Sequence, residues 1–234
     1  MASPQLRSEM AASPSIRMAD LLQANHDLVL MLPRFGIRLG FGERSVAEVC
    51  AESGVSPQFF LMVCRFYVVD TYRPSAAELE AMDLQGVLSY LTTSHRYYRE
   101  DRIPHIAAHL RHIADGCPGQ LGTALMRFAT SYRRRVERHL KNEENTLFRR
   151  LAALAEGRVF HVPASRYDRQ HGDIAADLQD LTSILIKYLP EDILQQERVK
   201  VLDDIFHLSE DLRRHTLIEE HLLMPYVALK EAAQ

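Results

Sequence analysis

The chain has 234 residues, enough for one large domain or for a medium domain with a small appendage. Of these residues 47% are apolar and 25% are charged, which is typical of a globular protein. Its formal net charge of -3 gives no electrostatic reason to expect a nucleic acid or an anionic membrane surface as a partner. No segment approaches ~18 uninterrupted apolar residues, so no membrane span is expected.

Cysteine usage and the start of the sequence indicate the compartment. The three cysteines, Cys50, Cys64 and Cys117, are far apart and form no CxxC pair, which favours reduced thiols over a disulfide framework. The first residues contain no apolar stretch typical of a signal peptide. We therefore expect a cytoplasmic protein.

In chain order, residues 1–16 are rich in Ser, Ala and Pro and predict a disordered tail. Residues 17–72 predict a small helical N-terminal domain with glycines at its turns. Residues 73–83 have the character of a linker, with a helical turn capped by Ser75 and Glu78.

Residues 84–232 carry a long helical pattern. Breaks near residues 116–119, near residues 157–163 and at Pro190 divide it into four segments. Short connections between long helices favour antiparallel neighbours. The predicted fold is therefore all-α, an antiparallel up-down-up-down four-helix bundle preceded by the small N-terminal domain.

Ionisable residues interrupt the apolar stripe of each predicted bundle helix. Two helices carry a His-x-x-x-Glu motif, and the other two carry a single histidine; the residues are His95, His139, Glu143, His171, His215 and Glu219. Residues four apart lie on one helical face, so the imidazole and carboxylate of each motif can reach one ion. Both histidine pairs are 44 residues apart (95 to 139 and 171 to 215), and the second half follows the first by 76.

This set of side chains predicts a two-metal site. An unpaired carboxylate in an apolar core costs several kcal/mol, so two of them require a cation or a proton. Four imidazoles and two carboxylates suit a pair of first-row ions, with each glutamate able to bridge both. Oxygen and nitrogen ligands without thiolate favour iron or manganese, with zinc as a further candidate.

Other polar residues have simpler interpretations. His105, His109 and His112 share a helical face past Pro104, and a solvated face is favoured there over a second site. Glu144 and Glu220 are placed at the edge of the site or in solvent. Tyr132, seven residues before His139, is a candidate to support a ligand, although core packing alone would also explain it.

At these residues the chain resembles the hemerythrin-like (HHE cation-binding) family over residues 84–229. Four histidines and two bridging glutamates resemble its repair-of-iron-centres branch more than the oxygen-carrying hemerythrins, which use five histidines. Residues 35–50 are similar to the small domain of that branch, although Gly40 and Phe41 stand near where the branch carries a Cys-Cys pair. The resemblance implies two iron ions with room for an oxo bridge, and a role in mending iron–sulfur clusters after nitrosative or oxidative damage.

Three functions stay open from the sequence. The first is a di-iron stress-response protein that acts on nitric oxide, peroxide or oxygen, with iron–sulfur proteins as clients. The second is a reversible sensor or carrier of oxygen, nitric oxide or iron, without turnover. The third is a helical interaction module without metal. Residues 45–60 look like a helix–turn–helix but lack clustered Lys and Arg, so no nucleic acid is expected.

Overall fold

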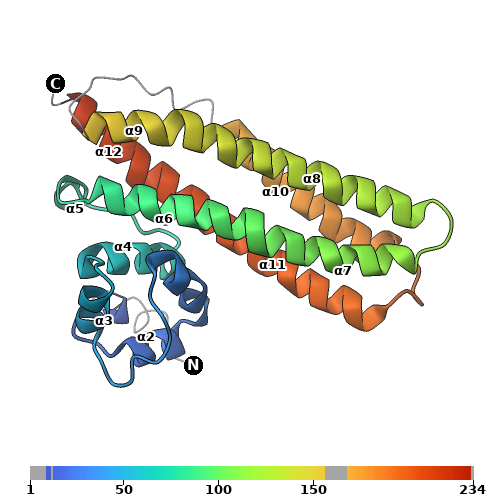
Figure 1. Ribbon diagram of the computed structural model, residues 1–234, viewed down its shortest axis with the longest axis horizontal. Helices are drawn as coiled ribbons and strands as arrows, with labels where there is room; N and C mark the ends of the chain where they lie inside the picture. The colour runs from blue at the N-terminus through green and yellow to red at the C-terminus, as the bar shows by residue number, and fades with distance from the viewer. Residues whose placement is uncertain (1–8, 12, 156–167, 233–234) are drawn as a thin grey trace. The chain divides into compact units, whose positions relative to one another are not determined.

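The structure is a computed structural model that describes residues 9–11, 13–155 and 168–232 (Figure 1). Within these ranges the chain is helical and contains no β-strand, which confirms the all-α prediction. Most of the predicted disordered tail (residues 1–16) lies outside the described residues. The predicted break at residues 157–163 lies wholly outside them. No described helix is both long enough and apolar enough to cross a membrane.

The described helices occur in two stretches. The helices up to residue 115 are α2 (Met18–Ala24), the 3₁₀ helix η1 (His26–Phe35), α3 (Val46–Glu52), α4 (Pro57–Val68), α5 (Ala76–Glu80), α6 (Leu84–Tyr97), the π-helix η2 (Tyr98–Arg102) and α7 (Ile103–Asp115). Those that follow are α8 (Leu121–Glu143), the π-helix η3 (Glu144–Phe148), α9 (Arg149–Ala155), α10 (Asp168–Ser183), the π-helix η5 (Ile184–Tyr188), α11 (Gln195–Ile218), the π-helix η6 (Glu219–Leu223) and α12 (Met224–Ala232).

Contacts divide the chain into two compact units. One comprises Met1–Ser94 with Leu217–Gln234, and the other comprises His95–Thr216. The predicted domain boundaries at residues 17, 73 and 84 stay predictions.

The first unit has an aromatic core. The ring of Phe35 packs against Phe59, Phe60 and Tyr90, with ring centroids 5.5, 5.2 and 4.7 Å away. The Tyr90 hydroxyl lies 3.1 Å from that of Tyr67. Edge-on aromatic contacts such as those of Phe35 with Phe59 and Phe60 stabilise by about 0.5–1.5 kcal/mol beyond the burial of their area.

Capping residues fix the short helices of this unit. Ser75 and Glu78 form a complete capping box at the start of α5, which confirms the predicted helical turn. Ser45 and Glu48 form a second one at the start of α3. Gly54, between α3 and α4, has φ 67°, a left-handed conformation that glycine adopts without a steric penalty.

The second unit encloses one continuous apolar core. Its buried members come from four helical runs: η2 with α7, α8, α10 with η5, and α11. Helix α8 packs on both α7 and α10. The predicted breaks at residues 116–119 and at Pro190 are confirmed, because α7 ends at Asp115 and α11 begins only at Gln195.

π-helical turns interrupt these long helices. In the first run the buried residues step from Tyr98 to Ile103, five positions apart, and η2 spans this step. Five residues of an α-helix would leave the second side chain about 140° away from the first, so an α-helix could not bury both on one face. The wider turn keeps both in the core.

Candidate metal centre

The six predicted ligands lie on four helical runs and are mostly buried. His95 lies near the end of α6, His139 and Glu143 in the last two turns of α8, His171 in α10, and His215 in α11. Glu219 begins η6, one turn after His215. His95 and Glu143 are fully buried, and the side chain of His171 is the most exposed of the set at 13%.

The carboxylate of Glu143 lies between two pairs of histidines. Its Oε2 is 3.4 Å from Nε2 of His95. Its Oε1 is 3.1 Å from Nε2 of His139 and 3.2 Å from Nε2 of His171. The two oxygens of one carboxylate therefore face different histidines.

The histidines on either side face each other closely. Nε2 of His95 and Nε2 of His215 are 3.0 Å apart. Two nitrogens that bind one cation at about 2.1 Å and roughly at a right angle also lie about 3 Å apart. On the other side, the rings of His139 and His171 have centroids 4.7 Å apart.

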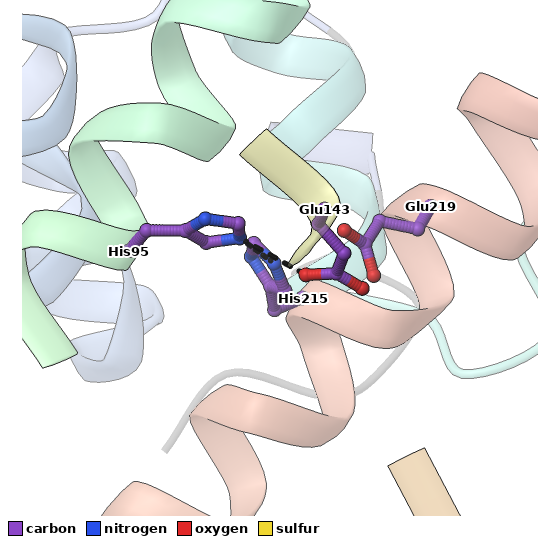
Figure 2. Close-up of side chains that lie close together, drawn as sticks. All are labelled: His95, Glu143, His215 and Glu219. Atoms are coloured by element: carbon purple, nitrogen blue, oxygen red, sulfur yellow. Dashed lines mark hydrogen bonds and ion pairs between the residues drawn. The ribbon is translucent and has the colours of Figure 1, made fainter. Parts of the chain in front are cut away.

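The donor atoms form two groups that share Glu143. One group is His95, Glu143, His215 and Glu219, and the other is His139, Glu143 and His171; within each, the ligand atoms lie within 4.8 Å of one another. Figure 2 shows the first group, with His95, His215 and the two carboxylates directed toward one another. The structure thus brings together all six predicted residues, and their role as ligands stays a prediction.

Glu144 lies at the edge of the site, one of the two positions predicted for it, and not in solvent. Its Oε1 is 3.2 Å from Nδ1 of His95 and 3.3 Å from Nη1 of Arg99. The hydrogen bond with His95, together with the nearby charge of Arg99, lowers the pKa of the Glu144 carboxyl. A carboxylate on Nδ1 leaves Nε2 of His95 available to a metal and fixes the orientation of the ring.

Aromatic rings enclose the same pair of histidines. Phe148 stacks on His95 with ring centroids 5.1 Å apart, and Tyr98 meets His215 edge-on at 5.6 Å. These rings cover the histidines and exclude water from them. Tyr132 instead lies in the apolar core, and its hydroxyl has no hydrogen-bond partner among the described residues, which favours the packing interpretation.

A groove gives access to the other side of the site. It has a volume of about 1060 Å³, runs along α8 and α10, and includes His139 in its lining. Exposed arginines, Arg127, Arg134 and Arg138, also line it. A small ligand, neutral or anionic, could therefore approach from this side.

The donor set fits a pair of cations. Glu143 and Glu219 are buried carboxylates in a protein interior, where a negative charge is costly unless positive charge compensates it. Four imidazoles and two carboxylates, with no cysteine in either group, are the nitrogen and oxygen ligands of first-row divalent ions. The buried charges and the donor chemistry therefore both point to metal.

Comparison with known families agrees with this chemistry. Residues 87–227 match the family described as the hemerythrin HHE cation binding domain. No curated protein and no solved structure matches the chain. Since the match spans more than half of the sequence and includes all six residues of the candidate centre, the chain belongs to the hemerythrin HHE cation-binding family.

Proposed function

We propose that this chain is a non-haem di-iron-binding protein. His95, His215 and Glu219 would hold one ion, His139 and His171 would hold the other, and Glu143 would be shared by both. The observation that carries the proposal is the position of Glu143, whose two carboxylate oxygens face histidines of the two different pairs. A carboxylate that bound only one metal ion, or that formed only a salt bridge with one histidine, would have no need of histidines on both sides.

Iron is the proposed metal, with manganese or zinc as alternatives that the ligands also accept. A bound iron pair would supply one-electron redox chemistry and an open coordination position for a small molecule. The chain's own residues prepare the site for it. Glu144 orients His95, and Phe148 and Tyr98 keep water away from the histidines that they cover.

The proposed physiological role is the response to nitrosative or oxidative stress, including repair of iron–sulfur clusters. Two features support it: the two donor groups contain four histidines, and the groove reaches His139, so oxygen, nitric oxide or peroxide can approach. An up-down-up-down bundle and a separate N-terminal domain resembling that of the repair-of-iron-centres proteins are part of this proposal.

Metal loading tests the centre itself. The full chain is reconstituted anaerobically with ferrous iron, desalted and analysed for iron and protein. We expect about two ions per chain, and a Glu143→Gln variant that retains at most one of them. A His207→Gln variant, changed at an exposed residue of α11, should load like the wild type. Unchanged loading of Glu143→Gln would contradict a shared, bridging carboxylate.

Reaction with nitric oxide tests the role. The reduced, iron-loaded chain is mixed with nitric oxide and excess reductant while an electrode follows the concentration of the gas. Sustained consumption that is absent from Glu143→Gln would support an enzyme. A single stoichiometric uptake, reversed on removal of the gas, would favour the sensor or carrier. Failure of both, together with failure to restore a damaged iron–sulfur protein, would leave a metal-binding protein without the proposed stress role.

A further inference from the structure

A second cluster of potential metal ligands lies in the unit formed by His95–Thr216. His105 and His109 on α7 and Asp204 on α11 each place one donor atom within 4.8 Å of the other two. None of the three belongs to the candidate di-iron centre. We propose that His105, His109 and Asp204 form a separate site for one divalent ion of the zinc or copper class.

The spacing of the histidines suits such an ion. His105 and His109 are four residues apart, so both rings project from one face of α7, and their centroids are 4.7 Å apart. Paired histidines at this spacing on a helix bind zinc in known motifs. Two histidines and one carboxylate from a second helix are also the ligand set of open zinc sites, which keep a fourth position for water or substrate.

The carboxylate of Asp204 is already oriented toward the histidines. Its Oδ2 lies 3.4 Å from Nε2 of His105, while its Oδ1 lies 3.1 Å from Nη2 of Arg102. Arg102 therefore holds one oxygen and leaves the other directed at the imidazole. The nearby positive charge also makes Asp204 a weaker ligand than an isolated carboxylate, which favours exchangeable binding.

A further carboxylate prepares His109. Glu197 on α11 forms a hydrogen bond with Nδ1 of His109. A carboxylate on Nδ1 selects the tautomer whose Nε2 accepts a metal, an arrangement that recurs around metal-bound histidines. Glu197 would therefore position a ligand without itself binding the ion.

Burial separates this site from the di-iron centre. The side chains of His105 and His109 are 50% and 26% exposed, whereas those of Asp204 and Glu197 are 18% and 19% exposed. The imidazoles are open to ions from solution, and the carboxylates are held in place by their surroundings. The simpler interpretation is two unrelated surface ion pairs, which contribute little to stability and require no particular arrangement of the two rings.

Zinc binding to the full chain distinguishes these interpretations. The iron-loaded wild type is titrated with zinc by calorimetry, and bound zinc and iron are counted after dialysis. We expect one additional zinc per chain, with iron unchanged. A His105→Ala/His109→Ala variant should bind that zinc at least ~100-fold more weakly, because it lacks two of the three ligands.

Two further variants make the result specific. Glu197→Gln should weaken zinc binding about 10- to 100-fold without abolishing it, since loss of a hydrogen bond to a ligating histidine has that effect. The control is His207→Ala, which changes an exposed histidine of α11 outside the proposed zinc site. This variant should bind zinc like the wild type. Zinc uptake that is equal in the wild type and the double variant would overturn the proposal.

The same titration in a Glu143→Gln background separates this site from the di-iron centre. Retention of the zinc there, and its loss when His105→Ala and His109→Ala are added, would support an independent site even if the chain holds no iron pair. Loss of the zinc in Glu143→Gln alone would overturn the proposal. If the double variant misfolds by circular dichroism, Asp204→Asn takes its place: we expect it to bind zinc at least ~10-fold more weakly, and wild-type zinc affinity would overturn the proposal.

Discussion

Among the side chains of the candidate metal centre, Glu143 and Glu144 are neighbours in sequence that contact different groups. Successive residues of a helix point about 100° apart, so one carboxylate faces the donor groups and the other faces the outer nitrogen of His95. In the proposed centre, Glu144 would be a positioning residue that acts through His95.

A substitution at Glu144 separates positioning from binding. Glu144→Gln should leave two metal ions per chain but weaken their affinity about 10- to 100-fold, because an amide orients and polarises His95 less strongly than a carboxylate. Competition with a chelator of known affinity measures the change. Glu220→Gln is the matched control, since Glu220 follows Glu219 as Glu144 follows Glu143; an equal effect of both variants would contradict the assignment.

The motifs that the sequence reveals differ in one respect from the contacts that it does not reveal. The pattern of His139, Glu143, His215 and Glu219 is local, since a four-residue spacing fixes which side chains share a face. The partner of Glu144 is 49 residues away, and Glu197 is 88 residues from His109. These contacts depend on how two helices are rotated against each other, which no spacing within a single helix reveals.

At the scale of single elements, the capping box of α5 links stability to pH. Although burial opposes it, hydrogen bonds from the Ser75 N–H and hydroxyl and the ion pair with Arg65 lower the pKa of Glu78 to about 2. A carboxyl with a lowered pKa stabilises the folded state above its ordinary pKa near 4.5. That contribution is lost as the pH falls from about 5 toward 2.

Glu78→Gln should therefore be less stable than the wild type at pH 7, by about 1 kcal/mol, and the difference should shrink as the pH falls below about 5. Urea unfolding at pH 7 and pH 4 measures both values. A difference that stays constant with pH would mean that the charge of Glu78 does not stabilise α5.

Close packing of α7 on α8 depends on a glycine. A Cβ at Gly122 would lie 2.1 Å from the backbone oxygen of Ala114, whereas one at Gly172 in α10 would meet nothing within 4 Å. Gly122→Ala should destabilise the chain by about 1–3 kcal/mol, because backbone cannot move aside. Gly172→Ala should be neutral or stabilising by up to about 1 kcal/mol. Chemical denaturation of both variants compares them, and equal effects would contradict the close approach.

Element boundaries were the most predictable part of the fold. Glycine and proline mark the break after Asp115 and the one at Pro190, and Ser75 with Glu78 marks the start of α5. The π-helical turns were not predicted, because the apolar period of 3.6 residues that indicates an α-helix does not include a step of five residues. They arise where the core requires a side chain that the α-helical period would turn away.

For the whole molecule, Glu143→Gln should have opposite effects on stability in the metal-free and the metal-loaded protein. Without metal, Glu143 is a fully buried carboxylate among histidines, and Glu143→Gln removes the desolvation cost of its charge together with its contacts to those histidines. With metal, the wild type gains the free energy of binding, about 2.7 kcal/mol at a free metal concentration 100 times the dissociation constant.

Thermal unfolding with and without iron should therefore show a reversal. Metal-free Glu143→Gln should unfold at the same or a higher temperature than the metal-free wild type, and the iron-loaded wild type should exceed both. Calorimetry of the four samples measures this order. A wild type that gains no stability from iron would argue that the two donor groups hold no ion.

A proline follows two of the π-helical turns. Pro104 is the second residue of α7, directly after η2, and Pro225 is the second residue of α12, directly after η6. Lacking an N–H, neither proline could close the ordinary four-residue bond back to the preceding turn if the helix tightened. The two prolines therefore prevent either run from becoming one continuous α-helix. The angle between the side chains before and after each proline is thus set by the sequence itself.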